Sequence, residues 1–353
     1  MSRLEHLRRE LAEKETDGVL ISQPENRFYL SGFDGSSGFL IITQDRAIIA
    51  TDFRYREQAK IQAEDFELHE IKGNMEVWLP EILGELKLEK LGFESEHVTY
   101  QLYDKVAKMR ASLSHRLKLV ALNGLVESLR AIKEPGEVEL ISNAVHLSDA
   151  AFEYIEETIH AGMSEREAAW ELEKFLRDKG SQTLPFEIIV ASGPNAAMPH
   201  HRPSERKLRS GEPVVIDFGA KVAGYSSDIT RTICPGKPDE QFNRIYDIVL
   251  GAQLAAITLI TEEMTGEEVD RLSRTVIEEA GYGQNFGHGL GHGVGLEVHE
   301  EPRLGPGTKE PLKNGMVFTI EPGIYLDGWG GVRIEDTVTL QNGKIQVISK
   351  ARK

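Results

Sequence analysis

The sequence predicts two domains, an α/β domain followed by an α+β domain made of two duplicated halves. Three observations support this fold class. The 353 residues are enough for two domains. Over residues 1–122 short apolar runs alternate with helical patterns, and at 123–136 glycine and proline interrupt them before a long helical pattern begins. The last part, 137–353, contains a weak internal repeat, which indicates a duplicated architecture.

Five short apolar runs predict the strands of the α/β domain: 18–21, 39–43, 47–50, 90–94 and 118–122. A leucine stripe that begins at Leu4 predicts an N-terminal helix, and residues 100–111 predict another helix. Residues 24–26 and 35–38 contain Pro, Asn, Gly and Ser and predict loops. This segment carries no complete set of catalytic residues, so we expect the chemistry to lie in the second domain.

The second segment starts the same kind of helix twice. Ser164 is followed three residues later by Glu167, and Thr265 is followed by Glu268 at the same distance. Each pair predicts a capping box, in which the hydroxyl and the carboxylate bond reciprocally to the first turn of a helix. In both halves a glycine follows sixteen residues after the cap, where it is expected to end the helix. The repeat therefore stays in register over a whole helix.

Each half also contains a predicted strand that ends in a carboxylate. Asp217 and Glu321 both lie six residues after a glycine, at the end of an apolar run. A second carboxylate follows in each half, Asp228 in the first and Glu335 in the second, as expected for antiparallel partners joined by a hairpin or loop. Carboxylates at the ends of buried strands need protons, partners or cations. We therefore predict that the two halves converge on one metal pair.

Residues 287–299 form a segment rich in glycine and histidine. Five glycines in nine residues rule out a stable helix, so His288 and His292 are not the paired zinc ligands of a helical metalloprotease motif. We expect the glycines to give the backbone conformational freedom to bring His292 to a metal, with His299 displaced toward the same cavity. One imidazole and four carboxylates suit a dinuclear site in which metals about 3.5–4 Å apart share a hydroxide for hydrolysis.

Composition limits the remaining function classes. The chain has 40% hydrophobic residues but no apolar run long enough to cross a bilayer and no secretory signal, so we expect a soluble, cytoplasmic protein without a membrane partner. Its formal net charge of -16 argues against a nucleic-acid partner, since phosphate backbones are bound by clustered Lys and Arg. The single cysteine, Cys234, excludes an internal disulfide.

Five motifs together resemble the proline-specific metallopeptidases, namely the prolidases and aminopeptidase P. The motifs are residues 216–219, 227–232, 288–299, 319–323 and 332–336. The resemblance covers essentially the whole chain. It implies a creatinase-like N-terminal domain over 1–122, a linker over 123–136, and a catalytic domain of the pita-bread fold over 137–353. In that fold two pseudo-symmetric halves surround a dinuclear site.

The resemblance also implies a ligand set and a reaction. Asp217 would chelate one metal, and Asp228 with Glu335 would bridge both. His292 with Glu321 would complete the second metal. Two divalent ions per subunit are implied, usually Mn²⁺ or Co²⁺ in this family, although the ligand types do not exclude Zn²⁺ or Fe²⁺. The reaction would be hydrolysis of an Xaa-Pro bond by a metal-bridging hydroxide, with Glu321 moving the proton.

Other residues resemble those that handle substrate in the family. His200 and His299 are similar to the histidines that contact the substrate and the developing oxyanion, although the neighbouring His201 leaves that assignment open by one place. His288 resembles a pocket residue that binds substrate. Arg333 resembles the arginine that steadies the bridging carboxylates and the substrate, and it is expected to take part in catalysis.

Arg303 bears on the length of the substrate. It lies four residues after His299, where similar prolidases carry an arginine that grips the C-terminal carboxylate of a dipeptide. A rim arginine paired with Glu300 or Glu301 is the structural alternative. We therefore expect an Xaa-Pro dipeptidase acting on short proline-containing peptides, with an Xaa-Pro aminopeptidase for longer peptides as the alternative. The resemblance further implies a homodimer.

Three other functions share this architecture. A metal-free creatinase-like hydrolase would require replaced ligands, and all five are present. A methionine aminopeptidase would leave residues 1–122 without a counterpart. A non-catalytic peptide-binding module on the same fold is the alternative from a different class, and loss of divalent-metal binding with retained peptide binding would favour it.

Overall fold

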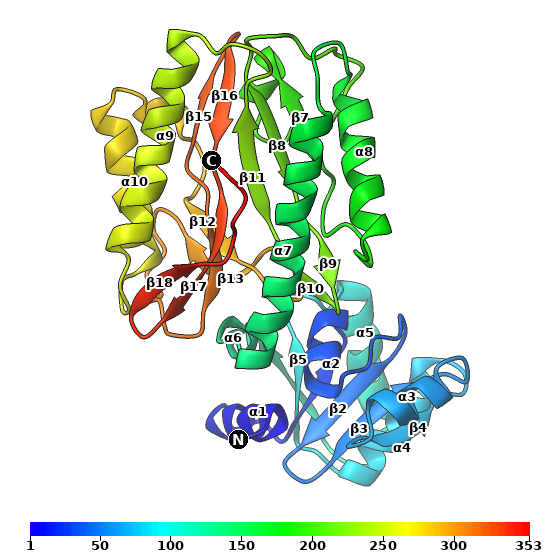
Figure 1. Ribbon diagram of the computed structural model, residues 1–353. Coiled ribbons are helices and arrows are strands. Elements are labelled where there is room, and N and C mark those ends of the chain that lie inside the picture. Colours follow the sequence, from blue (N-terminus) through cyan, green and yellow to red (C-terminus); the bar gives the residue numbers. More distant parts are fainter. The chain divides into compact units, whose positions relative to one another are not determined.

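The computed structural model describes all 353 residues. The chain forms two compact units, Met1–Arg130 and Ala131–Lys353 (Figure 1). The division falls within residues 123–136, the segment predicted to be a linker; the exact extent of that linker stays a prediction. No helix of the chain combines the length and the apolar character needed to span a bilayer.

The first unit is built on a six-stranded mixed sheet in the order β4-β3-β2-β1-β5-β6. Its strands are β1 (Gly18–Ile21), β2 (Phe39–Thr43), β3 (Ala47–Thr51), β4 (Glu67–Glu70), β5 (Lys90–Glu94) and β6 (Lys118–Leu122). Its helices are α1 (Arg3–Glu13), α2 (Pro24–Ser31), α3 (Arg56–Gln62), α4 (Met75–Leu86) and α5 (Tyr100–Met109), and α6 (Glu127–Ala131) follows β6. The α/β character expected of this part is confirmed.

Two local predictions for this unit are wrong. Residues 24–26 do not form a loop, because Pro24 occupies the first turn of α2, where its fixed φ suits a helix start and its missing N–H is not needed. Strand β4 was not expected. Its sequence is mostly polar, and it lies at the edge of the sheet, paired in parallel with β3, where little apolar surface has to be buried.

The second unit contains two helix pairs of matching design. The first pair is α7 (Pro135–Thr158) and α8 (Glu165–Asp178), and the second is α9 (Glu240–Leu259) and α10 (Gly266–Glu279). Both predicted capping boxes are present, and the glycines after the two helices have φ values of 105° and 87°, as left-handed helix ends require. Figure 1 shows the pairs on opposite sides of this unit with its strands between them.

The strands repeat in the same way. β8 (Val214–Phe218) pairs antiparallel with β11 (Ile229–Ile233), and β14 (Val317–Ile320) pairs antiparallel with β17 (Asp336–Gln341). A two-stranded hairpin separates the members of each pair, β9 (Lys221–Val222) with β10 (Tyr225–Ser226), and β15 (Gly323–Leu326) with β16 (Gly330–Arg333). The remaining strands are β7 (Ile189–Ser192), β12 (Gly291–Gly293), β13 (Glu300–Leu304) and β18 (Lys344–Val347). The internal duplication of an α+β domain is confirmed.

Each half has its own hydrophobic core beneath its sheet. In the first half Val214, Ile216 and Phe218 of β8 are completely buried among apolar residues of α7 and α8. In the second half Phe318 and Ile320 of β14 are buried in the core that includes α9 and α10. Burial of these runs fixes both strands, so the carboxylates at their ends have defined positions.

Candidate metal centre

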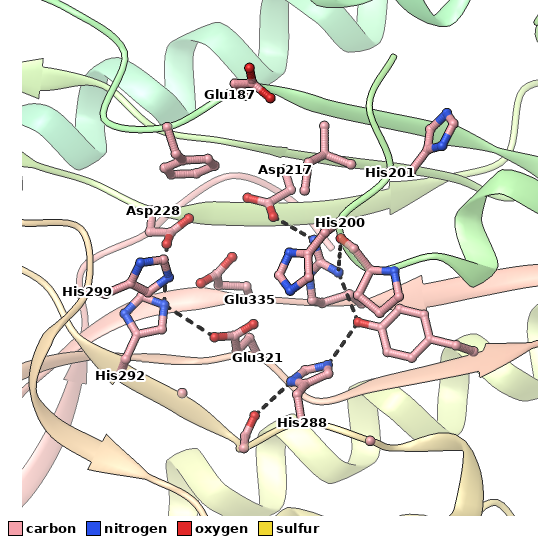
Figure 2. Close-up of a pocket in the computed structure, with 18 of the residues that line it drawn as sticks. Glu187, His200, His201, Asp217, Asp228, His288, His292, His299, Glu321 and Glu335 are labelled. Atoms are coloured by element: carbon pink, nitrogen blue, oxygen red, sulfur yellow. Dashed lines mark hydrogen bonds and ion pairs between the residues drawn. The ribbon is translucent and has the colours of Figure 1, made fainter. Parts of the chain in front are cut away.

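The second unit contains a cavity of about 830 Å³ on which both halves converge. It is lined by all five predicted metal ligands, Asp217, Asp228, His292, Glu321 and Glu335. His200, His288, His299 and Arg333 line the same cavity. Figure 2 shows the four carboxylates directed toward a common space, with His292 and His299 on one side of it. Arg303 is not among the lining residues.

The position of each carboxylate follows from the strands. Asp217 lies on β8, opposite Thr230 of β11, and Asp228 comes just before β11. Glu321 follows β14, and Glu335 comes just before β17. The Glu335 N–H donates to the Thr230 carbonyl at 3.0 Å, which ties the second half to the first. Two copies of one strand pair therefore deliver two carboxylates each to one place.

The donor atoms fit a divalent metal. One ligand atom each from Asp228, His292 and Glu335 lie within 4.8 Å of one another. His292 Nε2 lies 3.6 Å from Asp228 Oδ2 and 3.4 Å from Glu321 Oε1. The Oδ1 atoms of Asp217 and Asp228 are buried without a hydrogen-bond partner. Buried carboxylate oxygens without donors are expected where a cation supplies the missing contact.

The electrostatics of the cluster also favour bound cations. Burial raises the pKa values of Asp228 and Glu335 well above their ordinary range, and repulsion from neighbouring carboxylates raises them further. Burial likewise raises the pKa of Glu321 to about 8. Arg333 is the one arginine that bonds to the side-chain carboxylates of this cluster, and its bond is to Asp217. Two divalent cations would supply the positive charge that allows all the carboxylates to ionise together.

His292 is prepared to act as a neutral ligand. Burial, together with the neighbouring His299, lowers the pKa of His292 to about 4, so the ring is uncharged at neutral pH. Its Nδ1 lies 3.1 Å from the Gly293 carbonyl oxygen, which selects the tautomer with the proton on Nδ1. The Nε2 lone pair is then free and faces the carboxylates.

The glycines around His292 have a different role from the one expected. None of the five glycines from 287 to 295 has a positive φ, so the expectation that they supply unusual backbone freedom is wrong. They are needed because other atoms come too close for a side chain. A Cβ at Gly291 would lie 2.1 Å from the Thr319 carbonyl oxygen, and one at Gly293 would lie 2.1 Å from the Glu301 carbonyl oxygen. Close packing of β12 between its neighbours excludes every larger residue.

The structure separates the two adjacent histidines. His201 Nε2 lies 2.9 Å from Glu165 Oε2, so this ring is bonded at the start of α8. Figure 2 shows His200 among the carboxylates and His201 directed elsewhere. His200 is also close enough to His288 and His299 to lower the pKa of each, although burial is the larger cause in both cases. His200 is therefore the histidine placed to meet a ligand, and its predicted role stays a prediction.

Tyr325 is a site residue that the sequence did not indicate to us. Its hydroxyl accepts from Arg333 Nη1 at 2.9 Å and lies 2.9 Å from His288 Nε2. His288 has a pKa lowered to about 4, mainly by burial, and its Nδ1 lies 2.8 Å from the Gly289 carbonyl oxygen. The neutral ring thus accepts at Nε2, and the Tyr325 hydroxyl donates to it. The sequence could have indicated Tyr325 only through its place in the mostly buried strand β15, because a buried phenol needs a polar partner.

Arg333 connects this chain of hydrogen bonds to the carboxylates. Its Nη2 donates to Asp217 Oδ2 at 2.6 Å, and its Nε donates to the Thr230 hydroxyl at 3.1 Å. Thr230 in turn donates to Glu335 Oε2 at 2.7 Å. One guanidinium therefore orients a carboxylate from each half.

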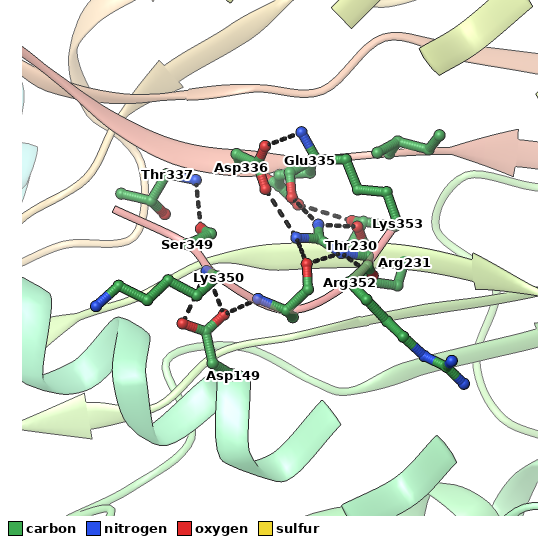
Figure 3. A network of polar contacts seen from close by, with 12 residues as sticks. Asp149, Thr230, Arg231, Glu335, Asp336, Thr337, Ser349, Lys350, Arg352 and Lys353 are labelled. Atoms are coloured by element: carbon green, nitrogen blue, oxygen red, sulfur yellow. Dashed lines mark hydrogen bonds and ion pairs between the residues drawn. The ribbon is translucent and has the colours of Figure 1, made fainter. Parts of the chain in front are cut away.

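A second arginine holds the strands behind the ligands, as Figure 3 shows. Arg231 and Asp336 form a fully buried ion pair, with Nη2 and Oδ1 2.8 Å apart. The same guanidinium donates to the Glu335 carbonyl oxygen. The Thr337 hydroxyl donates to the Asp228 carbonyl oxygen at 2.8 Å. The main chain at two of the predicted ligand positions, Asp228 and Glu335, is therefore held by residues that do not line the cavity.

Arg303 lies near the site but outside the cavity lining. Its position on β13 is opposite His292 of β12, and its side chain is exposed. Its own N–H donates to Glu301 Oε2 at 3.1 Å. The predicted grip on a substrate carboxylate stays a prediction.

Comparisons with known proteins agree with this architecture. Residues 139–342 match metallopeptidase family M24, and residues 3–132 match the creatinase/prolidase N-terminal domain. The chain is 38% identical to an Xaa-Pro dipeptidase of Pyrococcus furiosus, over 99% of this chain and 98% of that protein.

Two solved structures are similar over nearly the whole chain. The Xaa-Pro dipeptidase of Bacillus anthracis has a TM-score of 0.96 and 42% identity, covering 99% of this chain and 98% of that one. The X-Pro aminopeptidase of Thermotoga maritima has a TM-score of 0.90 and 36% identity, covering 100% of this chain and 98% of that one. The creatinase-like N-terminal domain and the pita-bread catalytic fold expected from the sequence are confirmed.

Proposed function

The chain belongs to metallopeptidase family M24, and from that premise we propose that it hydrolyses the Xaa-Pro bond of proline-containing dipeptides. One observation carries the proposal. Four carboxylates and one imidazole converge from two duplicated halves on one cavity, with buried carboxylate oxygens that lack any donor. The names of the similar dipeptidases supply the substrate class.

We propose that Asp217, Asp228, His292, Glu321 and Glu335 bind two divalent ions. When bound, such ions supply Lewis acidity, which makes a water molecule acidic and polarises a carbonyl group. The carboxylate-rich donor set favours Mn²⁺ or Co²⁺ and is compatible with Zn²⁺ or Fe²⁺.

The protein residues would then handle the protons and the developing charge. Glu321 would take a proton from the attacking water at a carboxylate oxygen and return it to the proline nitrogen, which needs it because a tertiary-amide nitrogen is a poor leaving group. His299 and His200 would donate hydrogen bonds to the carbonyl oxygen as it becomes negative. Arg333 would keep Asp217 in place and remain protonated throughout.

The second candidate is an Xaa-Pro aminopeptidase acting on longer peptides. The exposed position of Arg303 outside the cavity lining favours it, because a dipeptide clamp should reach the bound substrate. The X-Pro aminopeptidase of Thermotoga maritima also has nearly the same fold. The two candidates differ in whether Arg303 contacts a terminal carboxylate.

Hydrolysis of Ala-Pro and Ala-Pro-Ala by EDTA-stripped enzyme, with and without Mn²⁺, tests the proposal. We expect Mn²⁺-dependent cleavage of Ala-Pro in preference to the tripeptide. Loss of charge-assisted hydrogen bonds in Arg303→Ala should raise KM for Ala-Pro by about 10–100-fold. The exposed Arg271→Ala variant serves as the control and should keep the parental KM. Preference for the tripeptide would establish the aminopeptidase, and cleavage of neither peptide with Mn²⁺, Co²⁺ or Zn²⁺ would refute the Xaa-Pro assignment.

We further propose that the enzyme acts in the cytoplasm as a homodimer. The proposal depends on the similarity to other members of the family. Sedimentation of the active enzyme at working concentrations tests the oligomeric state, and a monomer alone would contradict the homodimer.

A further inference from the structure

Glu165 is a buried carboxylate outside the cavity. It is the first residue of α8, follows the capping residue Ser164, and has 0% of its surface exposed. A charged group in such a place has to be satisfied by donors around it. Burial works to raise its pKa, but hydrogen bonds from four side chains outweigh burial and hold the pKa at about 2. Glu165 is therefore an anion at neutral pH.

The two carboxylate oxygens of Glu165 bind opposite ends of one loop. Oε1 accepts from the Ser192 N–H at 2.9 Å, the Ser192 hydroxyl at 2.7 Å and the Asn195 amide at 2.9 Å. Oε2 accepts from the Ser204 N–H at 3.0 Å, the Ser204 hydroxyl at 2.6 Å and His201 Nε2 at 2.9 Å, and it lies 3.2 Å from the Asn195 amide. Since every partner donates, only a group that accepts at both oxygens satisfies them all.

The loop held in this way, residues 192–204, carries His200. It also rests on β16, next to Arg333. A Cβ at Gly331 would lie 2.2 Å from the Ala196 carbonyl oxygen, so the two backbones are in direct contact. Arg333 Nη1 lies 3.5 Å from the Pro199 carbonyl oxygen. His200 is thus placed by β16 on one side and by Glu165 at both ends of its loop.

We propose that Glu165 is a positioning residue, which joins the two ends of the 192–204 loop and thereby sets His200 in the cavity. The inference rests on the proposed function, in which His200 contacts the substrate. The location at a helix N-terminus adds to the stability of the carboxylate, since the helix dipole favours negative charge there. Glu165 does not itself line the cavity; of the lining residues its side chain bonds only to His201, and it bonds to none of the five proposed metal ligands.

The test is a double-mutant cycle between Glu165→Gln and His200→Ala in the Mn²⁺-loaded enzyme. Glutamine has the same shape, but its NH₂ group donates hydrogen bonds and would replace one of the two accepting oxygens. The loop residues that donate to that oxygen would lose their partner, and one end of the loop would be released. A displacement of about 1 Å near a reacting group can lower activity roughly 100-fold, so we expect Glu165→Gln to lower kcat/KM for Ala-Pro by about 10–100-fold, mainly through kcat. In the His200→Ala background Glu165→Gln should lower kcat/KM by less than about 3-fold, because the imidazole that Glu165 is proposed to position is already absent.

Two further variants guard against general misfolding. Glu167→Gln is the matched control, because Glu167 lies on the same helix, two residues away, and bonds to Ser164 and Lys207 rather than to the loop. It should retain the parental kcat/KM. Ser204→Ala removes one hydroxyl from the network and should give a smaller loss with the same dependence on His200. Equal losses from Glu165→Gln in both backgrounds would overturn the proposal, since a merely structural residue would weaken both enzymes alike.

Hydrogen–deuterium exchange, measured without substrate, tests the proposal independently of the reaction. We expect amides of residues 193–204 to exchange at least about 10-fold faster in Glu165→Gln than in the parent or in Glu167→Gln, because local opening is no longer opposed. Unchanged exchange in this loop would overturn the positioning role even if activity fell. If the parent cleaved no Xaa-Pro peptide, the proposed function would fail, while faster exchange would still support the placement of the His200 loop by Glu165.

Discussion

Replacement of Arg231 by methionine should destabilise the second unit strongly. The side chains of Arg231 and Asp336 are 1% and 0% exposed, and the guanidinium also donates to the carbonyl oxygens of Ala351 and Arg352, in addition to that of Glu335 (Figure 3). Methionine fills a similar volume but donates nothing. The variant would leave several buried acceptors unsatisfied at once.

The magnitude follows from the buried ion pair. Removing one partner of such a pair costs about 3–5 kcal/mol, because the remaining charge stays buried. Asp336 keeps one cation, since Lys353 Nζ lies 2.5 Å from its Oδ2, so the lower part of this range is expected. For a unit of roughly 150–250 residues each kcal/mol lowers Tm by about 2–4 °C. Arg231→Met should therefore lower Tm by roughly 6–12 °C.

Calorimetry of the metal-free protein measures this effect, and Arg352→Met provides the control. Arg352 pairs with Glu156 at 2.5 Å, but its side chain is 74% exposed, so its loss should cost less than about 1 kcal/mol. Titration calorimetry with Mn²⁺ adds a second readout, because Arg231 bonds to the main chain of Glu335 and support of this kind is worth about 10–100-fold in metal affinity. Equal Tm values for the two variants would refute the reasoning.

Three other outcomes are expected. Because hydrogen bonds hold the pKa of Glu165 at about 2, below its ordinary 4.5, its contribution to stability is complete above pH 4.5 and is lost as the pH falls toward 2. Urea unfolding should show that Glu165→Gln loses less stability than the parent as the pH falls over that range. An identical dependence of the free energy of unfolding on pH in the two proteins would contradict this. Asp228→Asn should weaken Mn²⁺ binding by more than about 100-fold in titration calorimetry. Glu187 is an exposed carboxylate at the cavity, and the Glu187→Gln variant should bind Mn²⁺ as the parent does. Equal affinities of the two variants would exclude Asp228 as a ligand. Gly291→Ala should lower stability by about 1–3 kcal/mol, because its Cβ would meet a β14 carbonyl oxygen, whereas Gly287→Ala meets nothing within 4 Å and should be neutral by thermal unfolding.

The sequence was most informative where local pattern and tertiary structure agree. The two capping boxes are short-range signals, and the hydrogen bonds at Ser164 and Thr265 are those that the spacing predicts. The apolar runs before Asp217 and Glu321 predicted buried strands for the same reason. Strand β4 was missed because an edge strand can be polar, so its pairing with β3 leaves little trace in its own residues.

The residues of the candidate site also differ in whether a local sequence pattern reveals them. The carboxylates were visible because a duplication placed them in register, whereas Tyr325 and Glu165 gain their positions only through folding. Glu165 has the sequence context of an ordinary first-turn acid on a helix. Its partners lie 27–39 residues away along the chain. No local pattern distinguishes such a residue from a solvated one.

A difference between the duplicated halves explains why the site holds a single imidazole among its five proposed ligands. The main-chain N–H of His292 on β12 donates to the hydroxyl of Thr319, which lies two residues before the first carboxylate of the second half. In the first half the matching place, two residues before its first carboxylate, is Val215, and the residue opposite it on β7 is Ala191. Ala191 is buried in an apolar cluster and has no donor atom to offer in its side chain. Both halves kept their strand-end carboxylates, but only one has an imidazole at the neighbouring strand, so the two metal positions would differ in ligand chemistry although the folds that hold them match.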